Sequence, residues 1–178
     1  MTEYYFDMET TGTNFVTDKI ITIQWQRLNG FTGKPIGNLN ISKSWESSEE
    51  SVIKAFLPYL KCRPFDFIFI GKNLLFDFCF LNQKLKEYKL GEIDLPCLYE
   101  RATVDIKHIL VMVNNGNFLG YDKILPKSSP LSNDKIPLLY EERKYSEIVK
   151  YIEDESSDFL KAYQIMKKEM PLFKERLN

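Results

Sequence analysis

The sequence predicts an α/β or α+β layered domain, in which strands come first and helices then flank a mixed sheet. Short segments with alternating or aromatic character, separated by turn signals, fill the first 41 residues. A near-continuous apolar run at 65–70 is typical of a strand covered on both faces. Apolar residues at helical spacing then dominate the second half. Because 178 residues is about the length of one domain, we expect a single domain over 1–178.

Each element follows from its local pattern. Strands are predicted at 3–7, 20–25 and 36–41, with a turn at Asn29-Gly30, and a buried strand at 65–70. The predicted helices are 49–60, 76–88, 105–113 with Asp105 near its start, a short one at 121–125, and a long one at 144–170. Glycines, prolines and asparagines make 114–137 the loosest part of the chain, and we interpret it as an excursion near a site.

Composition restricts the possible function classes. Hydrophobic residues at 44% and aromatic residues at 14% exclude intrinsic disorder. The absence of a long apolar run predicts a cytoplasmic protein without a membrane partner. Cys62, Cys79 and Cys97 lack zinc-type spacing and are expected to be reduced, mostly packed thiols. A net charge of −1 means that a polyanion would need local basic patches or bound cations rather than a positive overall field.

Two acids lie at and just beyond the end of the first predicted strand. Asp7 and Glu9 are at i and i+2, so if the strand extends over 4–9 they project from the same face and repel one another. A hard divalent cation between them would relieve this repulsion, because magnesium and manganese prefer oxygen ligands. The alternative for an isolated pair of this kind is a solvated strand end.

A third acid follows the buried strand. Asp77 is surrounded in sequence by Phe76, Phe78 and other apolar residues, so a charge there needs a partner. Asn73 lies where the chain leaves the strand, which is where α/β sheets place ligands. A turn asparagine followed by a helix-capping aspartate is the alternative interpretation.

The last helix carries a fourth acid in its apolar stripe. Glu155 falls in the middle of this stripe on a helical wheel, and Tyr151 is its i−4 neighbour. Asp158 lies at the edge of the same stripe. An acid in such a place is paired to a cation or neutralised, because an unpaired buried carboxylate is costly. An ion pair with one of the lysines is therefore the structural alternative to a functional site.

These residues resemble the motifs of the DEDD 3′–5′ exonucleases, an RNase H-like group. The run from Phe6 to Gly12 is similar to the first motif of that family, and the run from Gly71 to Leu81 to the second. The family's third motif carries histidine or tyrosine. The only histidine, His108, lies too early in the chain, so the tyrosine subtype is indicated. Tyr151 to Glu155 has the tyrosine subtype's spacing, but glutamate stands where the family usually has aspartate; Asp158 is the alternative.

The resemblance implies an RNase H-like fold, with three antiparallel strands followed by parallel strands in a mixed sheet flanked by helices. It also implies hydrolysis of single-stranded DNA or RNA from 3′ ends by two divalent ions, Mg²⁺ or Mn²⁺. Tyr151 would orient the attacking water. The implied metal ligands are Asp7, Glu9, Asp77 and Glu155, and the implied substrate contacts are Thr10, Thr11, Asn73 and Phe76. A catalytically silent module of the same fold, binding nucleic acid or protein, is the competing hypothesis.

Overall fold

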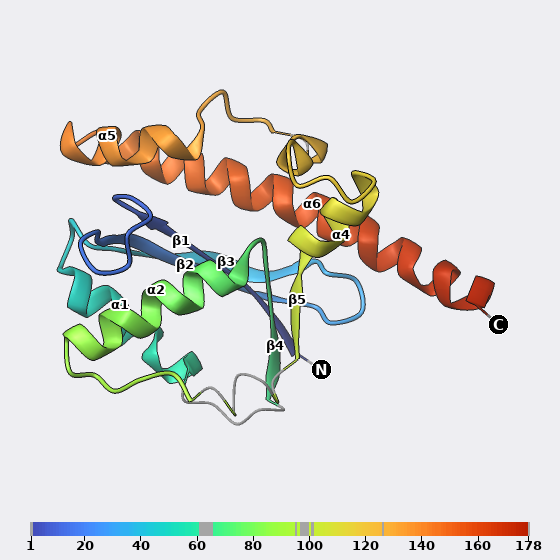
Figure 1. Ribbon diagram of the computed structural model, residues 1–178, viewed down its shortest axis with the longest axis horizontal. Helices are drawn as coiled ribbons and strands as arrows, with labels where there is room; N and C mark the ends of the chain where they lie inside the picture. The colour runs from blue at the N-terminus through green and yellow to red at the C-terminus, as the bar shows by residue number, and fades with distance from the viewer. Residues whose placement is uncertain are drawn as a thin grey trace.

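A mixed sheet flanked by helices forms the centre of the molecule (Figure 1). The computed structural model describes residues 2–60, 66–94, 96, 100, 102–125 and 127–177. The five strands lie in the order β3-β2-β1-β4-β5. Their bounds are β1 Thr2–Thr10, β2 Ile20–Leu28, β3 Pro35–Lys43, β4 Phe67–Gly71 and β5 Thr103–Asp105.

Strand directions divide the sheet into two parts. β1 pairs antiparallel with β2, and β2 pairs antiparallel with β3. β1 pairs in parallel with β4, which in turn pairs in parallel with β5. The predicted α/β class, with antiparallel strands followed by parallel ones, is therefore confirmed, and β1 lies at the centre of the sheet.

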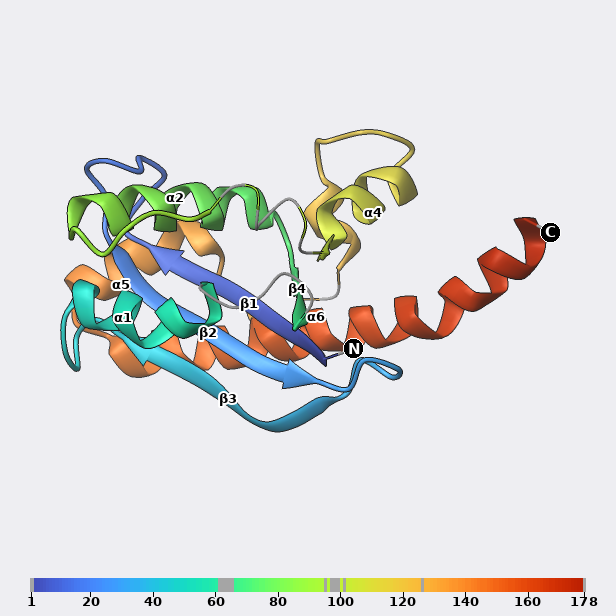
Figure 2. The ribbon, with the colours of Figure 1, turned by 90° about the horizontal axis from the view of Figure 1, so that it is seen from below.

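Helices cover both faces of this sheet (Figure 2). α1 and α2 pack on one face, while α4, α5 and α6 lie on the other. The long α6 crosses the sheet and extends beyond it at its C-terminal end. The bounds are α1 Glu49–Leu60, α2 Leu74–Glu87, α4 Ile106–Val113, α5 Ile136–Glu141 and α6 Tyr145–Leu177, with short 3-10 helices η1 Tyr121–Ile124 and η2 Asn133–Lys135.

The predicted helices are all present in the described chain, although the one at 121–124 is a 3-10 helix and α6 continues to Leu177, beyond its predicted end at 170. Asp105 is the N-cap of α4, and its carboxylate accepts the Lys107 amide, as its place in the sequence predicted. Three short elements were not predicted: β5, and η2 and α5 within and just beyond the segment expected to be loose.

Alternation along β1 sorts its side chains between the two layers. Phe6 and Met8 belong to the aromatic core beneath α1 and α2, where the Phe6 ring stacks on Phe56 with centroids 4.6 Å apart. Tyr5 lies in the core on the opposite face. Because side chains alternate along a strand, Asp7 and Glu9 share the Tyr5 face, toward α6.

The connection from β4 to α2 is fixed by three residues. Gly71 is required by close packing, since a Cβ there would lie 2.7 Å from the Phe6 carbonyl oxygen. Asn73 adopts the left-handed region (φ 66°), which asparagine tolerates better than most residues. Asp105 accepts the amide N–H groups of Asn73 and Leu74 at 2.8 and 2.9 Å. The N-terminus of α2 is thus capped by Asp105, not by the Asp77 side chain.

Two further expectations concern the cysteines and membranes. Cys79 is an exposed free thiol, so the expectation that it is packed was wrong. It occupies a solvent-facing position on α2, whose buried stripe includes Phe78 and Leu81 instead. Cys62 and Cys97 lie outside the described residues. Among the helices that the structure describes, none is both long and apolar enough to span a bilayer.

Candidate active site

The candidate site lies where β1 runs beneath α6. Two residues of a strand advance about 6.6 Å and four residues of a helix advance about 6 Å, so side chains on the two elements can match in register. Glu3 accepts a hydrogen bond from Tyr163 at 3.0 Å, and Tyr5 packs on Phe159 with ring centroids 4.9 Å apart. The next step along each element brings Asp7 to Glu155.

Three carboxylates lie close together where Asp7 meets Glu155. One oxygen each from Asp7, Glu9 and Glu155 lies within 4.8 Å of the others. At such separations two like charges repel by roughly 3 kcal/mol at an effective dielectric constant of about 20. Three ionised acids are therefore unstable together unless cations or protons join them.

A fourth acid, Asp77 of α2, lies close to these three carboxylates. It lies in the first turn of α2, is only 4% exposed, and lines the same cleft as the three clustered acids. Its charge raises the pKa of Glu9, and Asp7 in turn raises that of Asp77. It therefore adjoins the cluster without being one of the three mutually close acids.

Burial and mutual repulsion shift the acids toward their protonated forms. Burial first, and then the Glu155 carboxylate, raise the pKa of Asp7 to about 7. Burial also raises the pKa of Glu9 and of Asp77 well above their usual ranges, and Asp7 adds to both shifts. Perturbed acids gathered in a cleft are typical of functional sites.

The Asp7 carboxylate is held by a buried hydrogen-bond chain. Its Oδ2 accepts from the Tyr5 hydroxyl and from Gln24 Nε2, each at 3.2 Å. Gln24 is opposite Asp7 in the β1–β2 register, and its Oε1 accepts from Thr22 at 3.0 Å. These neutral groups orient the carboxylate but supply no counter-charge.

Tyr151 lies one turn before Glu155 and reaches the same region. Its side chain is only 3% exposed, and its hydroxyl donates to Asn133 Oδ1 in η2. Burial, followed by the charges of Glu9 and Glu155, raises the pKa of Tyr151 well above that of an ordinary phenol. Tyr151 is therefore a neutral hydrogen-bonding group at this site, and it is unsuited to act as a base.

The two candidates for the fourth acid have different surroundings. Glu155 belongs to the acid cluster. Asp158 Oδ2 accepts from the amide and hydroxyl of Ser128, at 2.5 and 2.7 Å, and Oδ1 pairs with Lys161 at 3.2 Å. Burial raises the pKa of Asp158, but the Ser128 hydrogen bonds outweigh it, so the pKa is lowered overall. Through these hydrogen bonds to Ser128, Asp158 connects the 127–131 segment to α6.

A cleft of about 630 Å³ opens over the acids. Thr10, Asn73 and Phe76 line it, as does part of the excursion at 121–137. Asn73 Oδ1 accepts from Lys107 at 2.7 Å, and Phe76 packs edge-on against Phe15 with centroids 5.5 Å apart. The remaining residues that line the cleft are Met8, Gly12, Thr13, Lys72, Tyr121, Lys127, Ser132, Asn133, Asp134 and Pro137, together with the four acids.

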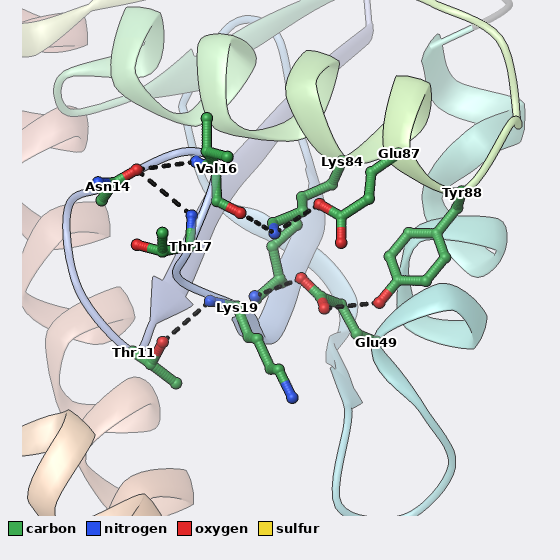
Figure 3. Close-up of polar contacts among 10 residues, drawn as sticks. Thr11, Asn14, Val16, Thr17, Lys19, Glu49, Lys84, Glu87 and Tyr88 are labelled. Carbon is green, nitrogen blue, oxygen red and sulfur yellow. Dashed lines mark hydrogen bonds and ion pairs between the residues drawn. The ribbon is translucent and has the colours of Figure 1, made fainter.

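The loop after β1 lines part of this cleft. Figure 3 shows the polar contacts that hold this loop. Thr11 is not among the cleft-lining residues, and its hydroxyl instead accepts the Lys19 amide at 2.9 Å. Farther along, Lys84 donates to the Val16 carbonyl at 3.4 Å, and Glu49 accepts the Ile20 amide at 2.8 Å. Contacts from α1 and α2 therefore hold the loop that connects β1 to β2.

The structure shows the ion pair with a lysine that was the alternative interpretation of Glu155, but the sequence did not identify which lysine. Lys72, between Gly71 and Asn73, places its Nζ 3.2 Å from Glu155 Oε1. Its position inside the second motif was the available signal, but a lone lysine in a turn does not reveal where its side chain points. His108, by contrast, is exposed on α4 and does not line the cleft.

Comparisons with known proteins give a match at the level of fold. Neither a family model nor a curated protein sequence matches the chain. An exonuclease I structure without ligand matches with a TM-score of 0.50 and 11% identity, over 63% of this chain and 30% of that one. The matched region has the exonuclease I fold. The RNase H-like class predicted from the motifs is therefore confirmed.

Two exonuclease I structures with bound nucleic acid match equally well. They are the zinc-ion-bound form of an E. coli exonuclease I complex with single-stranded DNA, and the E. coli enzyme with a dA16 oligonucleotide. Each has a TM-score of 0.51 and 12% identity, over 63% of this chain and 29% of its own. The present chain thus matches less than a third of the length of these exonuclease I chains.

Proposed function

We propose that this chain is a divalent-metal-dependent 3′–5′ exonuclease of the DEDD type, tyrosine subtype, acting on single-stranded DNA ends. The observation that carries the proposal is the convergence of Asp7, Glu9 and Glu155 within 4.8 Å, with Asp77 lining the same cleft. The fold of this region, shared with exonuclease I, supports it. RNA is left as a second substrate to test.

The donor set suits hard divalent cations. All four acids offer carboxylate oxygens, the ligands that Mg²⁺ and Mn²⁺ prefer. Burial makes it costly for all four acids to be ionised at once, and the hydrogen bonds to Asp7 come from neutral groups. Bound cations would therefore stabilise the ionised forms. We assign Asp7, Glu9, Asp77 and Glu155 as the ligands. Two such ions, when bound, supply activation of water and stabilisation of the leaving 3′ oxygen.

The remaining roles fall to neutral groups around the acids. Tyr151 orients the attacking water by hydrogen bonding, because its raised pKa keeps the phenol protonated. Phe76, at the rim of the cleft, is a stacking surface for a terminal base, a contact worth roughly 1–3 kcal/mol. Thr10 and Asn73 line the cleft and contact the terminal nucleotide. Thr11 supports this contact indirectly, because its hydroxyl accepts the Lys19 amide and holds the loop.

Charge at the site supports binding of phosphate despite the net charge of −1. Bound cations would neutralise the acids, and Lys72 and Lys127 line the cleft. Bound cations would therefore hold a phosphodiester without a basic surface elsewhere.

The experiment is a nuclease assay with a 5′-labelled single-stranded DNA oligonucleotide and Mn²⁺. A ladder of shortened labelled products is expected for the wild type, and none with EDTA or for Asp7→Ala. Glu50→Gln is the matched control, because it removes a surface carboxylate, one paired with Lys54 on α1. A 3′-labelled copy should release labelled mononucleotide first, which separates 3′–5′ removal from internal cleavage.

Absence of cleavage by the wild type under these conditions would overturn the proposal. If the intact oligonucleotide is nevertheless retained in a gel-shift measurement, the chain is a silent binding module of this fold. If neither cleavage nor retention occurs and Mn²⁺ does not bind, the acids form only ion pairs.

A further inference from the structure

Lys72 brings a positive charge into the acid cluster. It lies in the turn between β4 and α2, where Gly71 and Asn73 fix the backbone on either side. Its Nζ is 3.2 Å from Glu155 Oε1, and the two side chains are 22% and 21% exposed. Both groups are therefore partly shielded from water, and their attraction is stronger than that of a surface pair.

The charge of Lys72 acts on more than Glu155. It lowers the pKa of Asp7, of Glu9 and of Asp77, in each case against the larger effect of burial. Burial in turn lowers the pKa of Lys72, but Glu155 and Asp7 outweigh it and hold that pKa above its usual value. Lys72 thus serves as a charged counter-ion to the whole acid cluster.

A divalent ion would have to use the same Glu155 carboxylate. Glu155 Oε1, which accepts from Lys72, belongs to a carboxylate that lies within 4.8 Å of ligand atoms from Asp7 and Glu9. An ion shared by these three acids would therefore lie within a few ångströms of the ammonium. Two cations at that separation repel strongly, and the flexible lysine side chain is the group that can move.

We propose that Lys72 is a built-in counter-cation that a divalent ion must displace from Glu155, so that this lysine sets the metal affinity of the site. The inference rests on the proposed function, since it takes the acid cluster to be a metal site. In the metal-free protein Lys72 holds the acids together. In the loaded protein it weakens the binding of the ion, which makes occupancy of the site sensitive to the metal concentration.

The size of the effect follows from the charges. A single charge about 5 Å from a divalent ion changes its affinity by roughly tenfold or more, even at the dielectric constant of water. Lys72→Met removes the charge but keeps an unbranched apolar stem. Lys72→Arg keeps the charge. Lys54→Met is the matched control, because it removes a lysine paired with Glu50 at 2.7 Å on the surface of α1.

Titration calorimetry with Mn²⁺ alone tests the inference. We expect Lys72→Met to bind Mn²⁺ at least about tenfold more tightly than the wild type, and Lys72→Arg and Lys54→Met to bind like the wild type. In EDTA the melting temperature of Lys72→Met should fall, and Mn²⁺ should raise it by more than it raises that of the wild type. If Lys72→Met does not fold, Lys72→Gln is measured in the same way.

Two failures are distinguishable. If the wild type binds Mn²⁺, Asp7→Asn does not, and Lys72→Met shows equal or weaker affinity, the inference about Lys72 is wrong while the proposed metal site stands. If the wild type and all variants bind no Mn²⁺, the proposed function fails, and the Lys72 inference fails with it.

Discussion

Replacing Asp7 by asparagine is expected to stabilise the metal-free protein at neutral pH. The carboxyl of Asp7 has its pKa raised from 3.8 to about 7, by burial and then by Glu155. Such a rise corresponds to about 4 kcal/mol of unfavourable free energy when the group is ionised in the folded state. Asparagine retains an oxygen that can accept from Tyr5 and Gln24, so the substitution removes the charge and preserves the hydrogen bonds.

The sign of the pH dependence follows from proton binding. Between about pH 4 and 7 the unfolded chain has lost the Asp7 proton and the folded chain still holds it. The folded state therefore binds more protons, and the free energy of unfolding falls as the pH rises through this window. Above pH 7 the full cost remains for the wild type and is absent from Asp7→Asn.

Urea denaturation in EDTA, followed by circular dichroism from pH 4.5 to 8, measures this difference. At pH 8 the free energy of unfolding of Asp7→Asn should exceed that of the wild type by up to about 4 kcal/mol, and its pH dependence should be flatter. Glu50→Gln, at the surface, should leave the wild-type profile unchanged. If Asp7→Asn is no more stable than the wild type at pH 8, or if its profile keeps the wild-type slope, the Asp7 carboxylate does not destabilise the folded protein.

Three further predictions concern α6 and the turn after β4. Glu155→Ala should abolish cleavage of the labelled oligonucleotide while Asp158→Ala retains most of it; the opposite ranking would show that the third motif is misaligned. Tyr151→Phe should lower kcat about tenfold or more and leave Mn²⁺ affinity unchanged in calorimetry, and a wild-type kcat would exclude the proposed role. Gly71→Ala should lower the free energy of unfolding by roughly 1–3 kcal/mol in urea, because its Cβ would lie 2.7 Å from the Phe6 carbonyl oxygen; unaltered stability would contradict the packing argument.

Much of the site was predictable because the periods of a strand and of a helix determine which face of each element its acids occupy. The period of two on β1 puts Asp7 and Glu9 on one face, and the period of 3.6 on α6 puts Glu155 in its apolar stripe. The structure brings these three residues together. The position of Asp77 just after a buried strand likewise indicated the sheet edge where it lies.

The parts that were missed depend on contacts between distant segments. Asp105 was recognised as the cap of α4, but nothing in its neighbourhood reveals that it also caps α2, from 31 residues away. Lys72 has a long flexible side chain, so its contact with Glu155 follows from the packing of α6 and not from local spacing. β5 has only three residues and carries too short a pattern to be recognised.

Crystals soaked in Mn²⁺, with anomalous difference density measured at the manganese edge, would locate divalent ions at the acid cluster. We expect peaks bounded by the carboxylates of Asp7, Glu9 and Glu155, with Asp77 as a further ligand and the Lys72 ammonium moved away from Glu155. A cluster without any peak, or a peak coordinated by Asp158 in place of Glu155, would show that these four acids are not the metal ligands.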